Sequence, residues 1–208
     1  MVEAHEIAEK IQGEHEHEHA RHSDRAREWL RRATGIYLGI VAMLLAISTL
    51  GGAEATKTML NANIHATDTY AFYQAKYQRQ TMLELSAAQL ELLAGGTALS
   101  GEGAGKAAAL IKRYHDTATR YESDPSAGNG KKELLEKAKD WEAIRDHAEE
   151  QIPNFEYGEA MYQIAIVLGS VAIIASSPWI LGFSGVLAVL GTLLTINGYF
   201  LLVPLAAH

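Results

Sequence analysis

The stretch AMYQIAIVLGSVAIIASSPWILGFSGVLAVLGTLLTINGYFLLVPLAA, residues 160–207, decides the fold. It contains no Lys, Arg, Asp or Glu and consists mainly of Leu, Ile, Val, Ala and Gly. One bilayer crossing needs about 20 apolar residues in a helix, so the stretch is long enough for two crossings. Proline cannot continue a helix and tryptophan favours the membrane interface, so Ser176-Ser177-Pro178-Trp179 predicts a tight turn between them. We therefore predict membrane helices at about 160–177 and 180–203.

A third apolar segment, residues 33–53, lies between Arg32 and Glu54. At about 1.5 Å per residue it forms a helix of about 31 Å, the thickness of the hydrocarbon core of a bilayer. Ala53-Glu54-Ala55 is similar to a signal-peptide cleavage site, but the charged segment 1–32 is much longer than an ordinary n-region. We expect an uncleaved membrane helix that follows a charged tail.

The charges that flank the spans predict an orientation. The first span is preceded by five arginines: Arg21, Arg25, Arg27, Arg31 and Arg32. Four glutamates precede the second span: Glu149, Glu150, Glu156 and Glu159. Positively charged flanks remain in the cytoplasm. We therefore expect a cytoplasmic N-terminus, with residues 54–158 and the C-terminus outside.

Residues 54–158 carry the pattern of an all-α extramembrane domain. No proline or glycine occurs from Glu54 to Ala94, so the first span is expected to continue outward as one helix until Gly95-Gly96 ends it. Two further helices are predicted, Lys106–Glu122 and Lys131 to about Gln151, with apolar residues at three- and four-residue spacing.

Prolines are expected to end both of these later helices. Asp124-Pro125 follows the first one, and Ile152-Pro153 is expected to break the second one before the membrane span begins. The predicted fold class is therefore all-α. It is an integral membrane protein with three transmembrane helices and a helical-hairpin or coiled-coil extramembrane domain.

The composition narrows the function classes. The net charge is −7 and no basic patch with interleaved aromatic residues occurs, which argues against a nucleic-acid partner. The chain has no cysteine, which excludes disulfides and thiol catalysis. In SGEGAGKAA, residues 100–108, Ser100 and Ala107 stand where a phosphate-binding loop needs a glycine and a hydroxyl. We expect a non-enzymatic protein with no catalytic residues and no bound cofactor.

The stretch GEHEHEHARH, residues 13–22, is the one candidate metal site. On a helix His15, His19 and His22 share one face, and Glu18 borders that face. Three imidazoles and a carboxylate suit Zn²⁺, Ni²⁺ or Cu²⁺. The alternative is a solvated tail, because nothing apolar holds the segment in place and the Glu-His alternation is of low complexity.

Three quoted stretches resemble one known family. They are IYLGIVAMLLAISTLGGAEATKTMLNANIHATDTYAFYQAKYQRQTMLEL (36–85), YESDPSAGNGKKELLEKAKDWEAIRDHA (121–148) and YQIAIVLGSVAII (162–174). The chain resembles the bacterial membrane-protein family catalogued as domain of unknown function 4337, most specifically in NANIHATDTYAFYQAK (61–76). The resemblance implies three spans in a bacterial inner membrane, a helical insert and no assigned activity.

Two surfaces are candidates for association. In lipid, helices associate where small residues let the backbones approach, and Gly35-x-x-x-Gly39 begins such a face on the first span. Outside the span, Tyr70, Tyr73 and Tyr77 form an aromatic band, which serves either packing within the hairpin or contact with a partner. We expect a homo-oligomer or an accessory subunit of a larger membrane complex. The alternatives are a channel-like oligomer and a metal-responsive protein that uses the histidine-rich tail.

Overall fold

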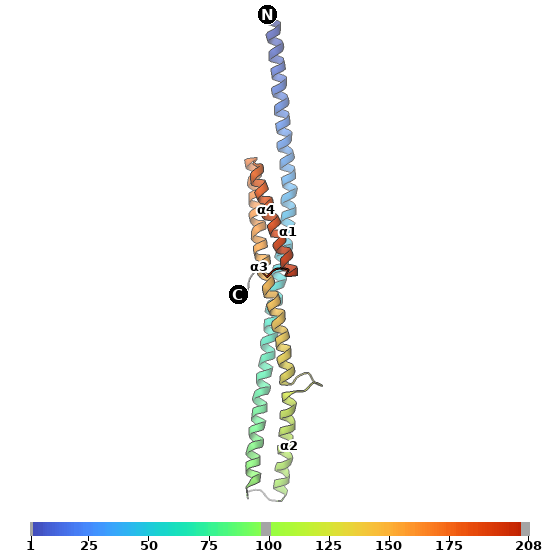
Figure 1. The fold of residues 1–208 in the computed structure, drawn as a ribbon, viewed down its shortest axis with the longest axis vertical. Coiled ribbons are helices and arrows are strands. Elements are labelled where there is room, and N and C mark those ends of the chain that lie inside the picture. Colours follow the sequence, from blue (N-terminus) through green and yellow to red (C-terminus); the bar gives the residue numbers. More distant parts are fainter. Residues whose placement is uncertain (1, 97–100, 205–208) are drawn as a thin grey trace. The chain divides into compact units, whose positions relative to one another are not determined.

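A computed structural model gives the arrangement of the helices (Figure 1). It describes the backbone of residues 2–96 and 101–204, and the side chains of residues 28–29, 31–96 and 101–204. The regular elements of these residues are all helices: α1 (Val2–Gly95), α2 (Glu102–Glu122), α3 (Lys131–Ala175) and α4 (Pro178–Phe200). The predicted all-α class is thereby confirmed for the described part of the chain.

Three helices, α1, α3 and α4, are long and apolar enough to cross a membrane. Each has the length and composition that a crossing requires, and together they are the three helices in which the sequence predicts spans. The fold therefore has the composition of a membrane protein with three spans.

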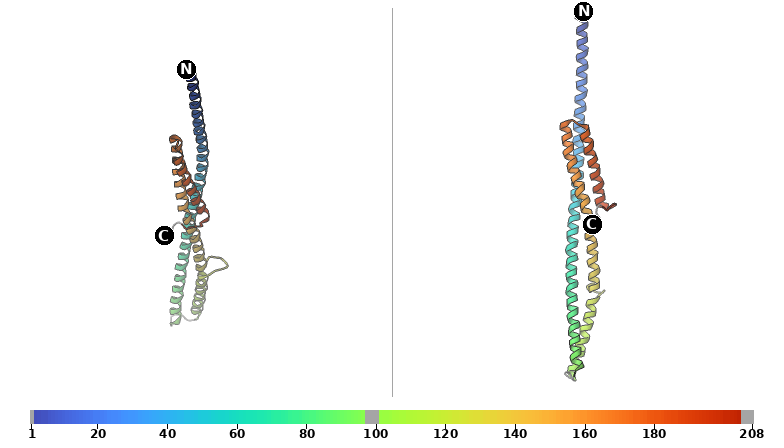
Figure 2. Two further views of the ribbon diagram at one scale, coloured as in Figure 1. Left: turned by 45° about the horizontal axis from the view of Figure 1, so that its top comes forward. Right: turned by 60° about the vertical axis from the view of Figure 1, so that its left-hand side comes forward.

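The chain divides into two compact units, which are described separately. The apolar unit contains Met1–Ala55 and Glu150–His208, and the hairpin unit contains Thr56–Glu149. In the apolar unit, α1, α3 and α4 lie side by side in every view (Figure 2). In the hairpin unit, α1 forms one limb, while α2 and the first part of α3 follow one another along the other limb. Helices α1 and α3 contribute to both units.

The turns of the hairpin unit have local causes. Helix α1 ends at Gly95, as the glycine pair predicts. Helix α2 begins at Glu102, four residues before the predicted start at Lys106, because Gly101 adopts a positive φ of 58° and the Glu102 carboxylate pairs with Lys106 at 2.7 Å. Helix α2 ends at Glu122, in agreement with the prediction from Asp124-Pro125.

The loop between α2 and α3 is tightly hydrogen-bonded around Asp124. Its carboxylate accepts hydrogen bonds from the Ser126 hydroxyl at 2.6 Å and the Ala127 amide at 3.1 Å. These two bonds lower the pKa of Asp124 below its usual range. The Ser123 hydroxyl donates to Glu133 at 2.6 Å and likewise lowers the pKa of that carboxyl. These hydrogen bonds therefore hold the loop between the two helices in a defined conformation.

The predicted break at Ile152-Pro153 is wrong, because α3 continues through Pro153 to Ala175. Proline inside a helix costs about 3 kcal/mol. The next two residues offset that cost: Asn154 and Phe155 are completely buried, and Asn154 Nδ2 donates to the Glu150 carbonyl at 3.0 Å. The Phe155 ring packs closely against Gly51, Gly198 and Tyr199, and these contacts favour the unbroken helix. Breaking the helix at Pro153 would withdraw both side chains from the bundle.

The turn between α3 and α4 lies where the sequence predicts it. Ser176 adopts a positive φ of 50°, Ser177 is the N-cap of α4, and Pro178 occupies the first turn of that helix, where its missing amide hydrogen costs nothing. Helix α4 ends at Phe200, where the Leu201 amide donates to the Asn197 carbonyl at 2.7 Å and Leu201 takes a left-handed conformation.

We predict opposite effects of alanine at two glycines of the hairpin unit. A Cβ at Gly130 would lie 2.5 Å from the Asp124 amide nitrogen and 2.6 Å from Ser123 Cα, whereas a Cβ at Gly105 would meet nothing within 4 Å. Gly130→Ala should lower the free energy of unfolding by about 1–3 kcal/mol. Gly105→Ala, in a helix interior, should raise it by about 0.5–1 kcal/mol. Thermal melts by circular dichroism in detergent measure both, and equal effects would contradict the geometry.

Candidate interaction surfaces

The apolar unit is held together by buried small and hydroxyl-bearing residues. On α4 they recur every three or four positions: Ser184, Ala188, Gly191, Thr195 and Gly198. On α1 the buried residues Thr34, Val41, Ser48 and Ala55 recur every seven. This spacing keeps one side of each helix facing its neighbours. Small residues there let the backbones come close, which is how helices associate in lipid.

Helices α3 and α4 approach each other closely at Gly158 and Gly191. A Cβ at Gly158 would lie 3.0 Å from Thr195 Oγ1 and 3.2 Å from Ser48 Oγ. A Cβ at Gly191 would lie 3.0 Å from the Tyr162 ring and 3.2 Å from the Gly158 carbonyl oxygen. These two positions therefore have room for little more than hydrogen.

Hydroxyl groups meet beside these glycines. Thr195 Oγ1 lies 3.2 Å from Ser48 Oγ and 3.3 Å from the Tyr162 hydroxyl. The Ser48 hydroxyl donates to the Phe155 carbonyl at 3.3 Å. Tyr162 donates to Thr192 Oγ1 at 3.2 Å. Because each hydroxyl has a single proton, the donors are used within the cluster or on backbone carbonyls. The cluster links α1, α3 and α4 without a charged group.

Polar contacts also join the helices elsewhere in the apolar unit. The Tyr37 and Ser184 hydroxyls are 2.8 Å apart, and Ser184 donates to the Ala165 carbonyl at 2.6 Å. Asn197 Nδ2 donates to Asn154 Oδ1 at 2.6 Å. This bond joins α4 to α3 through two uncharged amide side chains, as polar residues do between helices in lipid.

Phe155 fills a socket that the sequence analysis missed. A Cβ at Gly51 would lie 2.5 Å from its ring, and one at Gly198 would lie 2.9 Å away. The ring of Tyr199 contacts it edge-on, with centroids 5.0 Å apart and an interplanar angle of 80°. The signal in the sequence was the pair Gly51-Gly52 at the end of a predicted span, where a glycine pair is unfavourable in a helix unless a neighbour needs the space.

The glycines predicted for association have no neighbour in the described part of the chain. A Cβ added at Gly35 or at Gly39 would meet nothing within 4 Å. Ala42 and Ala46, the next small residues on that side of α1, are exposed. By contrast, a Cβ at Gly169 of α3 would lie 2.6 Å from the Leu38 side chain. The small residues of α3 are used within the apolar unit, and those on this side of α1 are not.

The three predicted tyrosines have different surroundings in the hairpin unit. The Tyr70 hydroxyl donates to Glu142 at 3.2 Å, and partial burial together with this carboxylate raises the pKa of Tyr70. The Lys131 ammonium lies 5.1 Å from the centre of the Tyr77 ring, whose side chain is nevertheless 55% exposed. Tyr73 and Tyr77 line a shallow surface depression with Gln74 and Gln78. The band thus contributes to hairpin packing and also leaves aromatic surface exposed.

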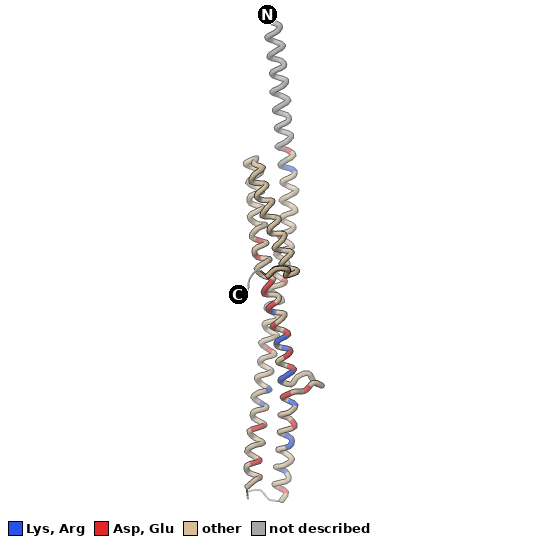
Figure 3. The backbone as a smooth tube through the Cα atoms, in the orientation of Figure 1, with Lys and Arg blue, Asp and Glu red and all other residues tan. Residues whose placement is uncertain are grey.

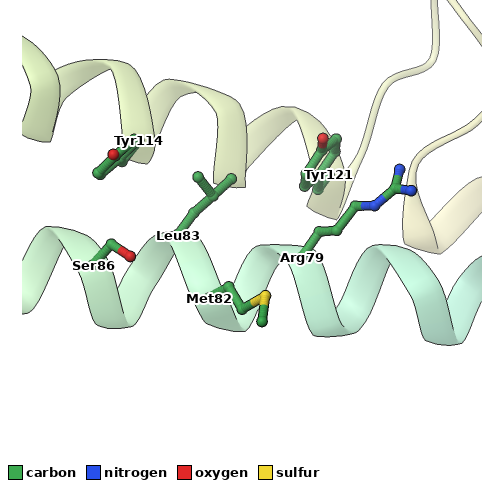
Figure 4. Close-up of a pocket in the computed structure, with 6 residues that line it drawn as sticks. All are labelled: Arg79, Met82, Leu83, Ser86, Tyr114 and Tyr121. Carbon is green, nitrogen blue, oxygen red and sulfur yellow. The ribbon is translucent and has the colours of Figure 1, made fainter.

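A shallow groove of about 250 Å³ lies between α1 and α2 (Figure 4). It is lined by Arg79, Met82, Leu83, Ser86, Tyr114 and Tyr121. Leu83 points from α1 toward α2 between the two tyrosines, and Lys76 lies 5.3 Å from the ring of Tyr121. The groove is open and smaller than the about 300–1,000 Å³ of ordinary ligand pockets. These residues do not combine a nucleophile with a general base.

The candidate metal ligands His15, His19 and His22 lie outside the described side chains. The tail also contains the H-E-x-x-H spacing (His15, Glu16, His19) found in zinc peptidases, which an alternation of Glu and His produces by itself. Among the side chains that the structure does describe, no group of three or more His, Asp or Glu residues is arranged to hold a metal ion.

The two histidines of the hairpin unit that have described contacts are engaged with single neighbours. His65 stacks on Trp141, with ring centroids 4.5 Å apart. His115 Nε2 lies 3.0 Å from Glu91.

The described fold is thus that of a helical protein with three potential membrane spans and a helical hairpin. A family model, domain of unknown function DUF4337, matches residues 30–201. The chain belongs to this family, as the resemblance in its sequence indicated. Neither a curated protein nor a solved structure matches the chain.

We predict that the Phe155 socket tolerates no added methyl group. Gly51→Ala should lower the free energy of unfolding by about 1–3 kcal/mol, because its Cβ collides with the Phe155 ring. Gly182→Ala is the matched control, because Gly182 is an exposed helix glycine with nothing within 4 Å of an added Cβ, and it should be neutral or stabilising. Thermal unfolding in nanodiscs measures both variants. Phe155→Leu combined with Gly51→Ala should recover part of the loss, and additive losses would contradict the assignment.

Proposed function

We propose that this protein is a non-enzymatic membrane protein that mediates assembly, either as a homo-oligomer or as an accessory subunit of a larger membrane complex. The observation that supports it is the exposed small-residue face of α1, formed by Gly35, Gly39, Ala42 and Ala46. Lipid tails are as apolar as leucine, so helices in a membrane associate through close packing and interhelical hydrogen bonds. A face of this kind, with no neighbour among the described residues, suits a second helix.

The packing of the apolar unit supports a partner from a different chain. The small-residue sides of α3 and α4 already pack within the protomer, at Gly158, at Gly191 and at the hydroxyl cluster. These contacts hold one protomer together, and the Gly35 side of α1 remains exposed. The exposed ring of Tyr77, with the half-buried Tyr73 beside it, supplies a further contact area in the hairpin unit.

Substitution of Gly39 tests this proposal. Gly39→Leu should dissociate the assembly while the protomer stays inserted and folded, because a bulky side chain separates the helix backbones. Gly182→Leu is the matched control, since Gly182 is also an exposed helix glycine with nothing within 4 Å of an added Cβ, but lies on α4. Mass measurement in nanodiscs compares both with the wild type.

The outcome that would overturn the proposal is equally specific. A wild-type protein that is strictly monomeric in native-lipid nanodiscs, with no co-purifying membrane protein, leaves no assembly for the Gly35 face to mediate. Equal dissociation by Gly39→Leu and Gly182→Leu would assign the effect to insertion or folding instead.

We also propose a location in the bacterial inner membrane, with the N-terminus in the cytoplasm and the hairpin unit outside. The support is the five arginines before the first span and the glutamates before the second. Since the chain has no cysteine, single cysteines report topology without background.

Labelling with an impermeant thiol reagent on whole cells tests the orientation. Ser23→Cys should stay unlabelled, and Ala127→Cys, in the exposed α2–α3 loop, should be labelled. Cell lysis should make Ser23→Cys reactive, which controls for its accessibility. Labelling at Ser23→Cys alone in intact cells would reverse the topology.

A further inference from the structure

The α1 limb of the hairpin unit has an unusual outer surface. Ile64, Ala71, Gln78, Leu85 and Leu92 recur every seven residues, and a second column recurs at the same spacing from Leu60 to Ala88. Together the two columns form the neutral stripe, in which the steps alternate between four and three residues. Every residue of the stripe is exposed and none is charged. Ile64 is 57%, Leu85 60% and Leu92 80% exposed.

The other limb of the same unit has the opposite character. The outward positions of α2 and α3 carry many charged residues, for example Lys112, Asp116, Lys139 and Asp140. Figure 3 shows this contrast: charges are dense on the first part of α3 and sparse on α1 beside it. Among the described residues of α2 and of α3 up to Glu149, Ile144 is the large apolar residue with substantial exposure, at 43%. Solvation alone therefore does not explain the neutral stripe.

The spacing and the charge of the stripe specify its occupant. Alternating steps of three and four residues are the repeat by which one helix packs along another. A charged partner surface would lose its hydration against an uncharged stripe without gaining an ion pair. A second copy of this chain supplies a helix with the same repeat and no charge.

The size of the stripe shows that it does not act alone. From Leu60 to Leu92 the helix is about 50 Å long, and a strip about 10–12 Å wide gives about 500–600 Å² of projected area per protomer. Stable complexes bury about 800 Å² per partner. Copies anchored in one membrane meet at a high effective concentration, which compensates for a modest interface.

We infer that the neutral stripe binds the same stripe of a second copy, in parallel and in register. The inference rests on the proposed membrane location and assembly, because copies inserted in one direction can pair their α1 helices only in parallel. Gln78 lies at the centre of the stripe, so the pairing brings two Gln78 amides together. Their side chains can donate to and accept from one another, as polar residues at the centre of helix pairs do when they fix register.

Single cysteines in the full-length, otherwise cysteine-free chain test the pairing in native-lipid nanodiscs under mild oxidation. Ile64→Cys, Ala71→Cys, Gln78→Cys and Leu85→Cys should each form a disulfide-linked dimer. A disulfide needs Cα atoms about 4.4–6.8 Å apart, which an in-register parallel pair provides at every one of these positions. Ala143→Cys, on the exposed side of α3, is the matched control and should remain monomeric on a denaturing gel.

A charge substitution gives an independent measurement. Ala71→Glu, made in the Leu85→Cys background, should lower the yield of the Leu85→Cys dimer about tenfold or more, because two carboxylates are brought together across the pair. Ala143→Glu in the same background should leave the yield unchanged. Both alanines are exposed helical residues, so a difference between them reports the interface and not helix propensity.

The outcomes separate this inference from the proposed function. An assembled protein whose stripe cysteines do not cross-link, or cross-link at one position near the centre only, overturns parallel self-pairing and leaves assembly standing. Cross-links from the stripe to a different protein also overturn it. A protein that is monomeric in the mass measurement overturns both.

Discussion

Close approach of helix backbones is the constraint on which the apolar unit depends. Hiding leucine from leucine contributes nothing in a membrane, so α3 and α4 are joined where Gly158 and Gly191 remove the side chains between them. The approach brings Thr195 within hydrogen-bonding distance of Ser48 and Tyr162, and thereby ties α1 to the same point. A larger residue at either glycine would separate the helices and leave the hydroxyl groups without partners.

The helices of the hairpin unit also pack through residues at three- and four-residue spacing, but different interactions stabilise them. Outside a bilayer, burial of apolar surface drives packing, and residues such as Leu134, Ala138 and Ala148 are buried on α3. Charged side chains such as Lys131 can be used there, and Lys131 pairs with Glu122 at 2.7 Å and lowers the pKa of that carboxyl. Hydroxyl groups add to the packing of the apolar unit without a charged group, whereas ion pairs such as that of Lys131 with Glu122 add to the packing of the hairpin unit.

Most of the fold could be predicted from the sequence, because its signals are local. Gly95-Gly96, Asp124-Pro125 and Ser176–Pro178 end or separate helices as local rules predict. The exception is Pro153, which a local rule assigns to a helix break. Tertiary packing of Asn154 and Phe155 decides that position, and nothing near Pro153 in the sequence reveals the glycine socket that Phe155 enters. Contacts between helices far apart in the chain have no local signature.

The candidate surfaces were predictable to a lesser degree, for the same reason. Spacing alone identified Gly35 and Gly39 as small residues on one face, but Ala165 and Gly169 have the same spacing in the sequence. Only the packing separates them, since Gly169 lies against Leu38, whereas a Cβ at Gly35 would meet nothing within 4 Å in the described part of the chain. Likewise, the neutral stripe of α1 is informative only because the structure shows that the opposite side of α1 packs against α2 and α3. A helix with apolar or neutral residues on two sides has one more packing surface than the described part of its own chain covers, and such a surface suits a second helix.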